Sequence, residues 1–199
     1  MLSAARLTCQ RGDAVLFRAL GFELAAGEAL MVRGANGSGK TSLLRILAGV
    51  AAPVEGEIFW RNSPDRQVRQ RETAYQGHTA PLKDELTVIE NLDFALALDG
   101  CSAERPALLD TIKAVGLAAR RNLPVRHLSQ GQRRRVGLAR LMLAKRPLWL
   151  LDEPATALDA AGLALFCDVL DRHLAEGGLA VLSTHQSLPL TRPVRELNL

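Results

Sequence analysis

Hydrophobic residues along the chain form two kinds of pattern: short continuous runs, and longer segments in which they recur at helical spacing. Continuous runs of strand length are typical of strands buried on both faces, whereas a spacing of three or four residues indicates a helix with one buried face. Strands are predicted at residues 29–32, 148–151 and 179–182. Helices are predicted at residues 43–47, 88–96, 106–115, 131–145 and 163–174.

Strands that alternate with helices predict an α/β fold with a mostly parallel sheet covered on both faces. Residues 1–28 precede this pattern and contain short β-prone segments, which predict an N-terminal antiparallel β part. Those segments lie at residues 7–9, 14–17 and 22–24. Another strand is predicted at residues 57–60, and the polar residues 62–71 are predicted to form a loop.

A helical stretch interrupts the α/β pattern between residues 81 and 127. Thr87 and Glu90 have the spacing of a capping box, in which each side chain bonds the backbone of the other at a helix start. With the helix at residues 131–145, this stretch predicts a small helical sub-domain at about 81–145. The α/β core would then consist of residues 1–80 and 146–199, within one domain of residues 1–199.

Composition narrows the class of protein without naming a function. The chain has 199 residues, is 48% hydrophobic and carries a net charge of +4, which is ordinary for a globular domain. No apolar window approaches the ~18 residues of a membrane helix, and no signal peptide is recognisable. The protein is therefore expected to stay in the cytoplasm. Its three cysteines show no metal-binding spacing, so reduced thiols are expected.

The clearest chemical signal is the motif G-x-x-x-x-G-K-[ST] between the strand at residues 29–32 and the following helix. Its glycines allow several backbone N–H groups to face one anion at a helix N-terminus. Lys40 would bring a positive charge to the β- and γ-phosphates, and Thr41 would offer a hydroxyl to Mg²⁺. The predicted nucleotide-binding residues are Gly34, Ala35, Asn36, Gly37, Ser38, Gly39, Lys40, Thr41 and Ser42.

Two carboxylates follow the apolar strand at residues 148–151, at the end where open α/β sheets bind ligands. Asp152 would hold Mg²⁺ directly or through water. Glu153 would act as the general base that polarises the attacking water. An Asp-Glu pair alone is weak evidence, but it gains weight in a chain with a complete phosphate-binding motif.

A third motif, Leu128-Ser129-Gln130-Gly131-Gln132, precedes the helix at residues 131–145. Ser129 can cap that helix, and Gly131 permits close backbone approach. This motif resembles the signature of ABC-type ATPases, and the order of the motifs along the whole chain is similar to that family. The resemblance implies a P-loop NTPase fold of the ABC ATPase type, hydrolysis of ATP, and ATP with Mg²⁺ as ligands.

The resemblance also assigns roles by position. Residues 34–41 resemble the Walker A loop, and residues 148–153 resemble the Walker B strand. Residues 157–159, which end at Asp159, resemble the D-loop, and His185 matches the switch histidine that contacts the γ-phosphate and the attacking water. In that family two subunits face head to tail, so the signature of one closes over ATP held by the other. A homodimer on ATP binding is therefore implied.

The chain departs from the family pattern at three places. Gln130 replaces the usual glycine of the signature. The adenine-stacking aromatic would fall on Arg11, whose guanidinium can stack, or Phe17 serves instead. The register of the Q-loop glutamine falls on His78 or Thr79, and the nearest glutamine, Gln76, is taken as the candidate.

Several further sequence segments narrow the resemblance to the haem exporter ATPases of cytochrome c maturation, the CcmA type. They lie at residues 75–78, 86–92, 147–162 and 184–186. This implies a peripheral subunit docked on membrane-spanning partners at the cytoplasmic face of the bacterial inner membrane. ATP hydrolysis would drive haem delivery or release of a loaded haem chaperone. No spacing of His or Cys suggests that the chain binds haem directly.

Three alternatives remain at this stage. The chain could energise another ABC exporter, or be a soluble ABC ATPase that acts on nucleic acid or ribosomes. The run Arg133-Arg134-Arg135 allows the second, but a solvated helix face explains it better, so no nucleic acid partner is expected. A nucleotide-gated module without turnover is the third, and the presence of Glu153 argues against it.

Overall fold

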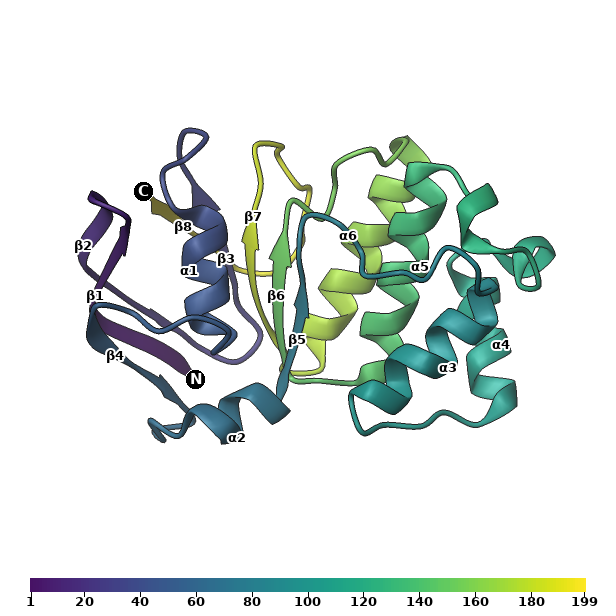
Figure 1. Ribbon diagram of the computed structural model, residues 1–199, viewed down its shortest axis with the longest axis horizontal. Coiled ribbons are helices and arrows are strands. Elements are labelled where there is room, and N and C mark those ends of the chain that lie inside the picture. The colour runs from purple at the N-terminus through teal and green to yellow at the C-terminus, as the bar shows by residue number, and fades with distance from the viewer. The chain divides into compact units, whose positions relative to one another are not determined.

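The computed structural model describes residues 1–199 and divides into two compact units (Figure 1). The first unit consists of Met1–His78, Arg146–Pro154 and Leu170–Leu199. The second consists of Thr79–Lys145 and Ala155–Val169. The sequence prediction placed residues 155–169 in the α/β core, whereas the structure groups them with the helical unit.

A five-stranded parallel sheet forms the centre of the first unit, in the order β5-β6-β7-β3-β8. Its strands are β3 (Ala29–Arg33), β5 (Thr73–Gln76), β6 (Leu148–Asp152), β7 (Leu179–Ser183) and β8 (Val194–Asn198). Every residue of β6 and β7 is buried, as their continuously apolar sequences predict. The predicted α/β class with a mostly parallel sheet is confirmed.

A three-stranded antiparallel sheet completes the first unit, in the order β2-β1-β4. Its strands are β1 (Leu2–Arg11), β2 (Ala14–Leu24) and β4 (Glu55–Trp60). Residues 14–24 form one strand rather than the two short ones predicted. The β1–β2 register shifts along its length, and Ala19 has a φ of 49°, so irregular pairing interrupts the apolar alternation without ending the strand.

Helix α1 (Lys40–Leu47) joins the two sheets into one core (Figure 1). Its apolar side chains Leu43, Leu44, Ile46 and Leu47 are almost completely buried. They pack in one cluster with apolar residues of the antiparallel strands and of β3, β6 and β7. This packing fixes the N-terminus of α1 at the edge of the sheet where the parallel strands end.

The prediction of a loop at residues 62–71 was wrong, because helix α2 (Arg66–Arg71) lies there. Asp65 caps it, and its Oδ1 accepts the N–H of Gln67 at 2.7 Å. The helix buries Arg69 instead of an apolar face, and the guanidinium donates to the carbonyls of Leu47 and Ile58. Burial lowers the pKa of Arg69. Because the buried face of this helix is polar, its sequence lacks the periodic hydrophobic residues from which a helix is predicted.

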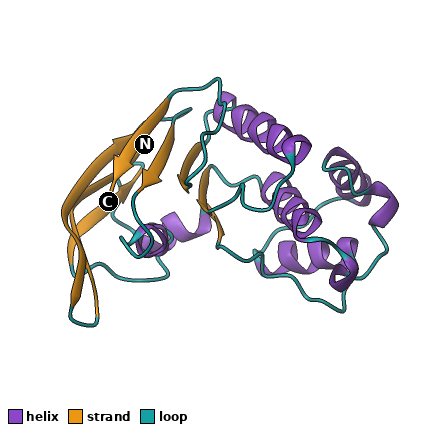
Figure 2. Ribbon diagram, turned by 90° about the horizontal axis from the view of Figure 1, so that it is seen from above, coloured by secondary structure: helices purple, strands orange, loops and turns teal.

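The second unit consists of helices and loops (Figure 2). Its elements include α3 (Val88–Leu98), α4 (Arg105–Ala114), α5 (Gln130–Ala144) and the short 3₁₀ helices Ala118–Arg120 and Val125–His127. Helix α5 packs against both α3 and α4. The predicted capping box at Thr87 and Glu90 is present, and these hydrogen bonds lower the pKa of Glu90.

Helix α6 (Ala160–Ala175) contains the last boundary between the units, after Val169. None of the helices combines the length and the apolar character that crossing a membrane requires.

His173, in the C-terminal half of α6, stacks on Trp149 of β6 within the first unit. The rings of His173 and Trp149 lie 3.9 Å apart with an interplanar angle of 7°. The Nε2 atom of His173 is 3.2 Å from the carbonyl oxygen of Leu179. Burial lowers the pKa of His173, partly offset by the Leu179 carbonyl and by Glu176.

Because the folded pKa of His173 is depressed, the unfolded chain binds this proton more readily, so stability falls as the pH drops below about 6.5. We expect the Tm of the wild type to fall more between about pH 7.5 and pH 5.5 than that of His173→Gln. Differential scanning calorimetry measures both. The exposed His78→Gln serves as the control and should keep the wild-type pH dependence. Identical pH profiles for the wild type and His173→Gln would contradict this account.

Candidate functional site

The loop between β3 and α1 contains three glycines in the left-handed region, at φ values of 145°, 87° and 109° for Gly34, Gly37 and Gly39. A Cβ at Gly34 would lie 2.6 Å from both the carbonyl oxygen of Leu199 and the Oγ of Ser38. At Gly39 it would lie 3.1 Å from the Phe17 ring. The loop conformation therefore requires glycine at these positions. This conformation places the backbone of the loop at the N-terminus of α1.

Lys40 folds back across this loop and is largely buried. Its Nζ donates to the carbonyl oxygens of Gly34 at 2.8 Å and Ala35 at 3.0 Å. These partners are neutral, so the positive charge has no anionic partner in the loop. The Oγ of Ser38 is also buried and has no hydrogen-bond partner. A buried cation and an unsatisfied hydroxyl in a glycine loop fit an anion such as a phosphate.

Asp152 ends β6 and is held through both carboxylate oxygens. Thr41 donates its hydroxyl to Oδ2 at 2.8 Å, and Ser183 donates to Oδ1 at 2.6 Å. Thr41 lies in the first turn of α1 and Ser183 ends β7, so the carboxylate ties three elements together. The structure thus brings together the two residues predicted to hold Mg²⁺, with oxygen donors that suit a hard cation.

Glu153 has a φ of 50°, a conformation that non-glycine residues rarely adopt. Its N–H donates to the Oγ of Ser183 at 3.0 Å and to the carbonyl oxygen of Ser183 at 3.2 Å. These bonds hold the strained residue in place, as is common at functional sites. The Oε1 atom lies 3.5 Å from the Nε2 of His185, whose side chain is 52% exposed. The structure therefore brings the predicted base and the predicted switch histidine together.

The sequence analysis assigned no role to Ser183, although its hydroxyl donates to the Asp152 carboxylate and accepts the backbone N–H of Glu153. The only signal in the sequence is its place directly after a buried apolar strand. Gln76 ends β5 beside Leu151 of β6 and is buried, so it lies at the same edge of the sheet. The predicted role of Gln76 stays a prediction.

The two candidates for the adenine contact lie in different surroundings. Arg11 ends β1 beside the hairpin turn and is exposed. Phe17 belongs to the buried core, with 8% of its surface exposed, and its ring packs close to Gly39. Its contact with the phosphate-binding loop is thus a packing contact, and Arg11 retains the free surface that stacking needs.

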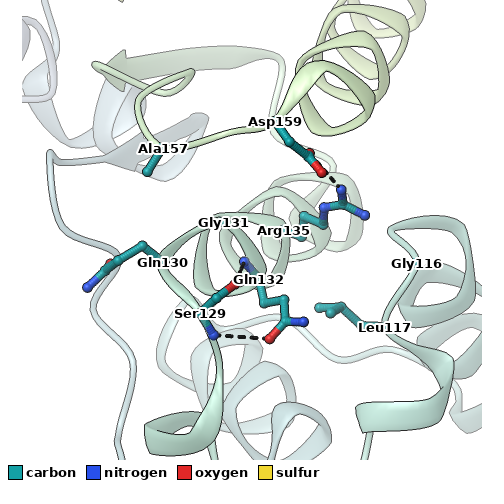
Figure 3. Close-up of a pocket in the computed structure, with 9 residues that line it drawn as sticks. All are labelled: Gly116, Leu117, Ser129, Gln130, Gly131, Gln132, Arg135, Ala157 and Asp159. Atoms are coloured by element: carbon teal, nitrogen blue, oxygen red, sulfur yellow. Dashed lines mark hydrogen bonds and ion pairs between the residues drawn. The ribbon is translucent and has the colours of Figure 1, made fainter.

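The third motif lies in the second unit and lines a pocket of about 440 Å³ (Figure 3). Ser129 caps α5 as predicted, with its Oγ accepting the N–H of Gln132 at 3.3 Å. The helix begins at Gln130, one residue earlier than predicted. A Cβ at Gly131 would lie 3.0 Å from the carbonyl oxygen of Ala157, so the backbones approach closely there. The pocket is lined by Gly116, Leu117, Ser129, Gln130, Gly131, Gln132, Arg135, Ala157 and Asp159.

Asp159 lies at the rim of this pocket, and Arg135 faces it from α5 (Figure 3). The N–H of Gly162 and the guanidinium of Arg135 both donate to Oδ1 of Asp159, and these bonds lower its pKa. The sequence analysis treated Arg135 only as part of a solvated basic run, because the position of its partner depends on the fold.

Comparison with known proteins gives consistent matches over the whole chain. Residues 17–156 match the model of the ABC transporter family. The cytochrome c biogenesis ATP-binding export protein CcmA of Aromatoleum aromaticum is 50% identical, covering 100% of this chain and 95% of that protein. The protein of the same name from Vibrio cholerae is 43% identical, over 97% of this chain and 95% of that one.

Solved structures resemble the fold closely. An ATP-binding cassette in a dimeric, post-hydrolysis state with ADP and Pi has a TM-score of 0.81 and 25% identity, covering 94% of this chain and 88% of that one. A putative ABC transporter ATP-binding protein from Pyrococcus furiosus has a TM-score of 0.87 at 22% identity, covering 98% of this chain and 96% of that one. The second likeness concerns the fold alone.

The geometry around Asp152 predicts that Ser183→Ala destabilises the protein. The change leaves a buried carboxylate oxygen and the N–H of Glu153 without the Ser183 hydroxyl, so we expect a loss of about 1–3 kcal/mol in the free energy of unfolding. Chemical denaturation measures this loss. Ser187→Ala, at an exposed position close by, is the control and should change little. Equal stability of Ser183→Ala and the wild type would refute the positioning role of Ser183.

Proposed function

Because this chain belongs to the ABC transporter family, among the ATP-binding proteins of cytochrome c biogenesis, we propose that it is the ATP-hydrolysing subunit of a membrane export complex. One observation supports this most directly. The phosphate-binding loop, the Thr41–Asp152 contact and Glu153 meet where parallel strands end. Ligands of open α/β sheets bind at such an edge.

The loop residues would hold the nucleotide through its phosphates. Backbone N–H groups of residues 34–41 face the anion, and the N-terminal end of α1 adds a favourable dipole. Lys40 is already poised at the loop, where it would exchange two carbonyl partners for phosphate oxygens. That exchange is favourable because hydrogen bonds between charged groups are stronger than those to neutral carbonyls.

The hydrolytic residues would be those at the ends of β6 and β7. Thr41 and Asp152 would hold Mg²⁺, which neutralises charge on the phosphates when it is bound. Glu153 would take a proton from the attacking water, and its partly buried carboxylate is within reach of His185. His185 would orient the γ-phosphate and this water.

A single copy of the chain supplies only part of the proposed site. The signature residues 128–132 lie in the second unit and would cover the nucleotide held by another copy, where Ser129 and the Gly131 amide add donors. A dimeric cassette with ADP and Pi is among the similar solved structures. We infer a homodimer that ATP stabilises and that hydrolysis releases.

The transport role follows from the relatives. Proteins named as cytochrome c biogenesis ATP-binding export proteins match essentially the full chain at 43–50% identity. We infer that this subunit docks on membrane-spanning partners of a cytochrome c maturation complex, at the cytoplasmic face of the bacterial inner membrane. Haem or a haem chaperone would be the cargo of the complex, without direct haem binding by this chain.

Replacing the proposed base should trap the ATP state. We expect Glu153→Gln to lower kcat at least about 100-fold, because a general base contributes that much to proton transfer. The variant should also form a dimer when ATP and Mg²⁺ are present, detected by size-exclusion chromatography with light scattering. Turnover at the wild-type rate would place the base elsewhere.

Lys40→Ala provides the matched test of nucleotide binding. The variant loses the loop's only lysine, so binding of ATP should be abolished in isothermal titration calorimetry. The double variant Lys40→Ala/Glu153→Gln should therefore remain monomeric with ATP. Lys113→Ala, on the exposed side of α4, should bind ATP as the wild type does. Normal ATP affinity in Lys40→Ala would refute the assignment of the loop.

The membrane partner is tested by affinity capture from detergent-solubilised bacterial membranes. The tagged wild-type chain should recover membrane-spanning cytochrome c maturation proteins, identified by mass spectrometry. Recovery of the membrane subunits of a different exporter would replace the transport assignment while leaving the ATPase intact. Recovery of ribosomes or DNA instead would favour a role outside membranes.

A further inference from the structure

An ion pair within the second unit joins the N-terminal half of α5 to the segment before α6. The Nη2 atom of Arg135 lies 3.1 Å from Oδ1 of Asp159, and both residues line the pocket formed with the signature residues (Figure 3). Arg135 is on the same helix as the signature, whereas Asp159 is the final residue of the predicted D-loop. The two predicted motifs are thus linked directly by side chains.

Asp159 also determines where α6 begins. Its Oδ1 accepts the N–H of Gly162 at 2.8 Å, and its backbone carbonyl accepts the N–H of Leu163 at 2.8 Å. This is the geometry of a helix N-cap. The Oδ1 atom therefore both caps α6 and accepts a hydrogen bond from Arg135. The orientation of the cap and the position of the guanidinium thus depend on each other.

The guanidinium lies where there is little room for other atoms. A Cβ at Gly116 would lie 3.0 Å from Nη1 of Arg135, and one at Gly162 would lie 2.8 Å from Oδ1 of Asp159. Only 22% of the Arg135 side chain is exposed. The guanidinium is therefore packed closely against glycine backbone and largely shielded from water where it meets the carboxylate.

The ion pair is poorly suited to stabilising the fold. The Asp159 side chain is 71% exposed, and pairs open to water contribute little to stability. The same helix has a better stabilising pair, because Arg140 donates to both carboxylate oxygens of Asp99 at 3.0 and 2.9 Å, and both partners are mostly buried. The contrast indicates that the Arg135–Asp159 pair fixes a position.

We propose that Arg135 is a positioning residue, which holds the D-loop through Asp159 so that the D-loop and the signature present one rigid surface to a second copy of the chain. The inference rests on the proposed function, since both motifs act on nucleotide only in the dimer. Arg135 itself touches no reacting atom. Its effect appears when two copies associate around ATP. A misplaced D-loop would then misalign the groups of the shared site, while phosphate binding in the first unit stays intact.

The test is a double-mutant cycle on steady-state ATP hydrolysis by the full chain. We expect Arg135→Gln and Asp159→Asn each to lower kcat about tenfold, with KM for ATP within about twofold of the wild type. The double variant should be no slower than the slower single variant, because Arg135 acts through Asp159. Arg140→Gln is the matched control, and it should lower Tm while leaving kcat near the wild-type value.

Three results would overturn the inference: wild-type kcat in Arg135→Gln, a double variant slowed by the product of the two single effects, or an equal loss of kcat in Arg140→Gln. Each of them leaves wild-type hydrolysis intact, so the proposed function survives. Absence of hydrolysis by the wild type with ATP and Mg²⁺, and of an ATP-dependent dimer in Glu153→Gln, would instead overturn the proposed function and the inference with it.

Discussion

The buried carboxylate of Asp152 is the constraint on which the site depends. A carboxylate taken out of water must have its oxygens satisfied, and here two hydroxyls do this, from Thr41 on α1 and Ser183 on β7. These bonds lock the first turn of the helix to the ends of two strands. The glycine loop ends at that helix, so the contact of its last residue, Thr41, with Asp152 also fixes the loop relative to Glu153.

The same arrangement explains why the site suits a charged ligand. Lys40 is buried against neutral carbonyls, Ser38 has an unsatisfied hydroxyl, and Glu153 is held at an unfavourable φ by the end of β7. The unsatisfied hydroxyl of Ser38 costs free energy in the isolated chain, and a phosphate would supply partners for it and for Lys40. The strained backbone of Glu153 is a cost that the bonds from Ser183 sustain. We interpret this as preorganisation for a nucleotide in a family of ATP-binding proteins.

The division into two units matches a division of chemical tasks. The first unit contains the phosphate-binding loop and both acidic residues, whereas the second contains the signature pocket and Asp159. Residues 154–157, between the Asp152-Glu153 pair and Asp159, form a turn in which Ala157 adopts a φ of 64°. In the proposed dimer, the second unit of one copy would complete the first unit of the other, which links hydrolysis to association.

The sequence by itself determined the elements that are buried on both faces or capped locally. Strands β6 and β7, helix α1, the capping box at Thr87 and the helix cap at Ser129 were predictable, because continuous apolar runs and short-range hydrogen bonds leave a signal in neighbouring residues. The glycine loop before α1 and the Asp152-Glu153 pair were recognisable for the same reason, and their roles remain predictions. Their spacing is local, and so is the chemistry that it implies.

Only the tertiary structure decided the features that depend on residues distant in sequence. Helix α2 buries Arg69 through bonds to Leu47 and Ile58, and strand β8 is largely exposed and forms by pairing with β3. The bonds of Ser183 to Asp152 and of Arg135 to Asp159 join positions 31 and 24 residues apart. Their partners are chosen by the packing of whole elements, and no periodicity along the chain records that choice.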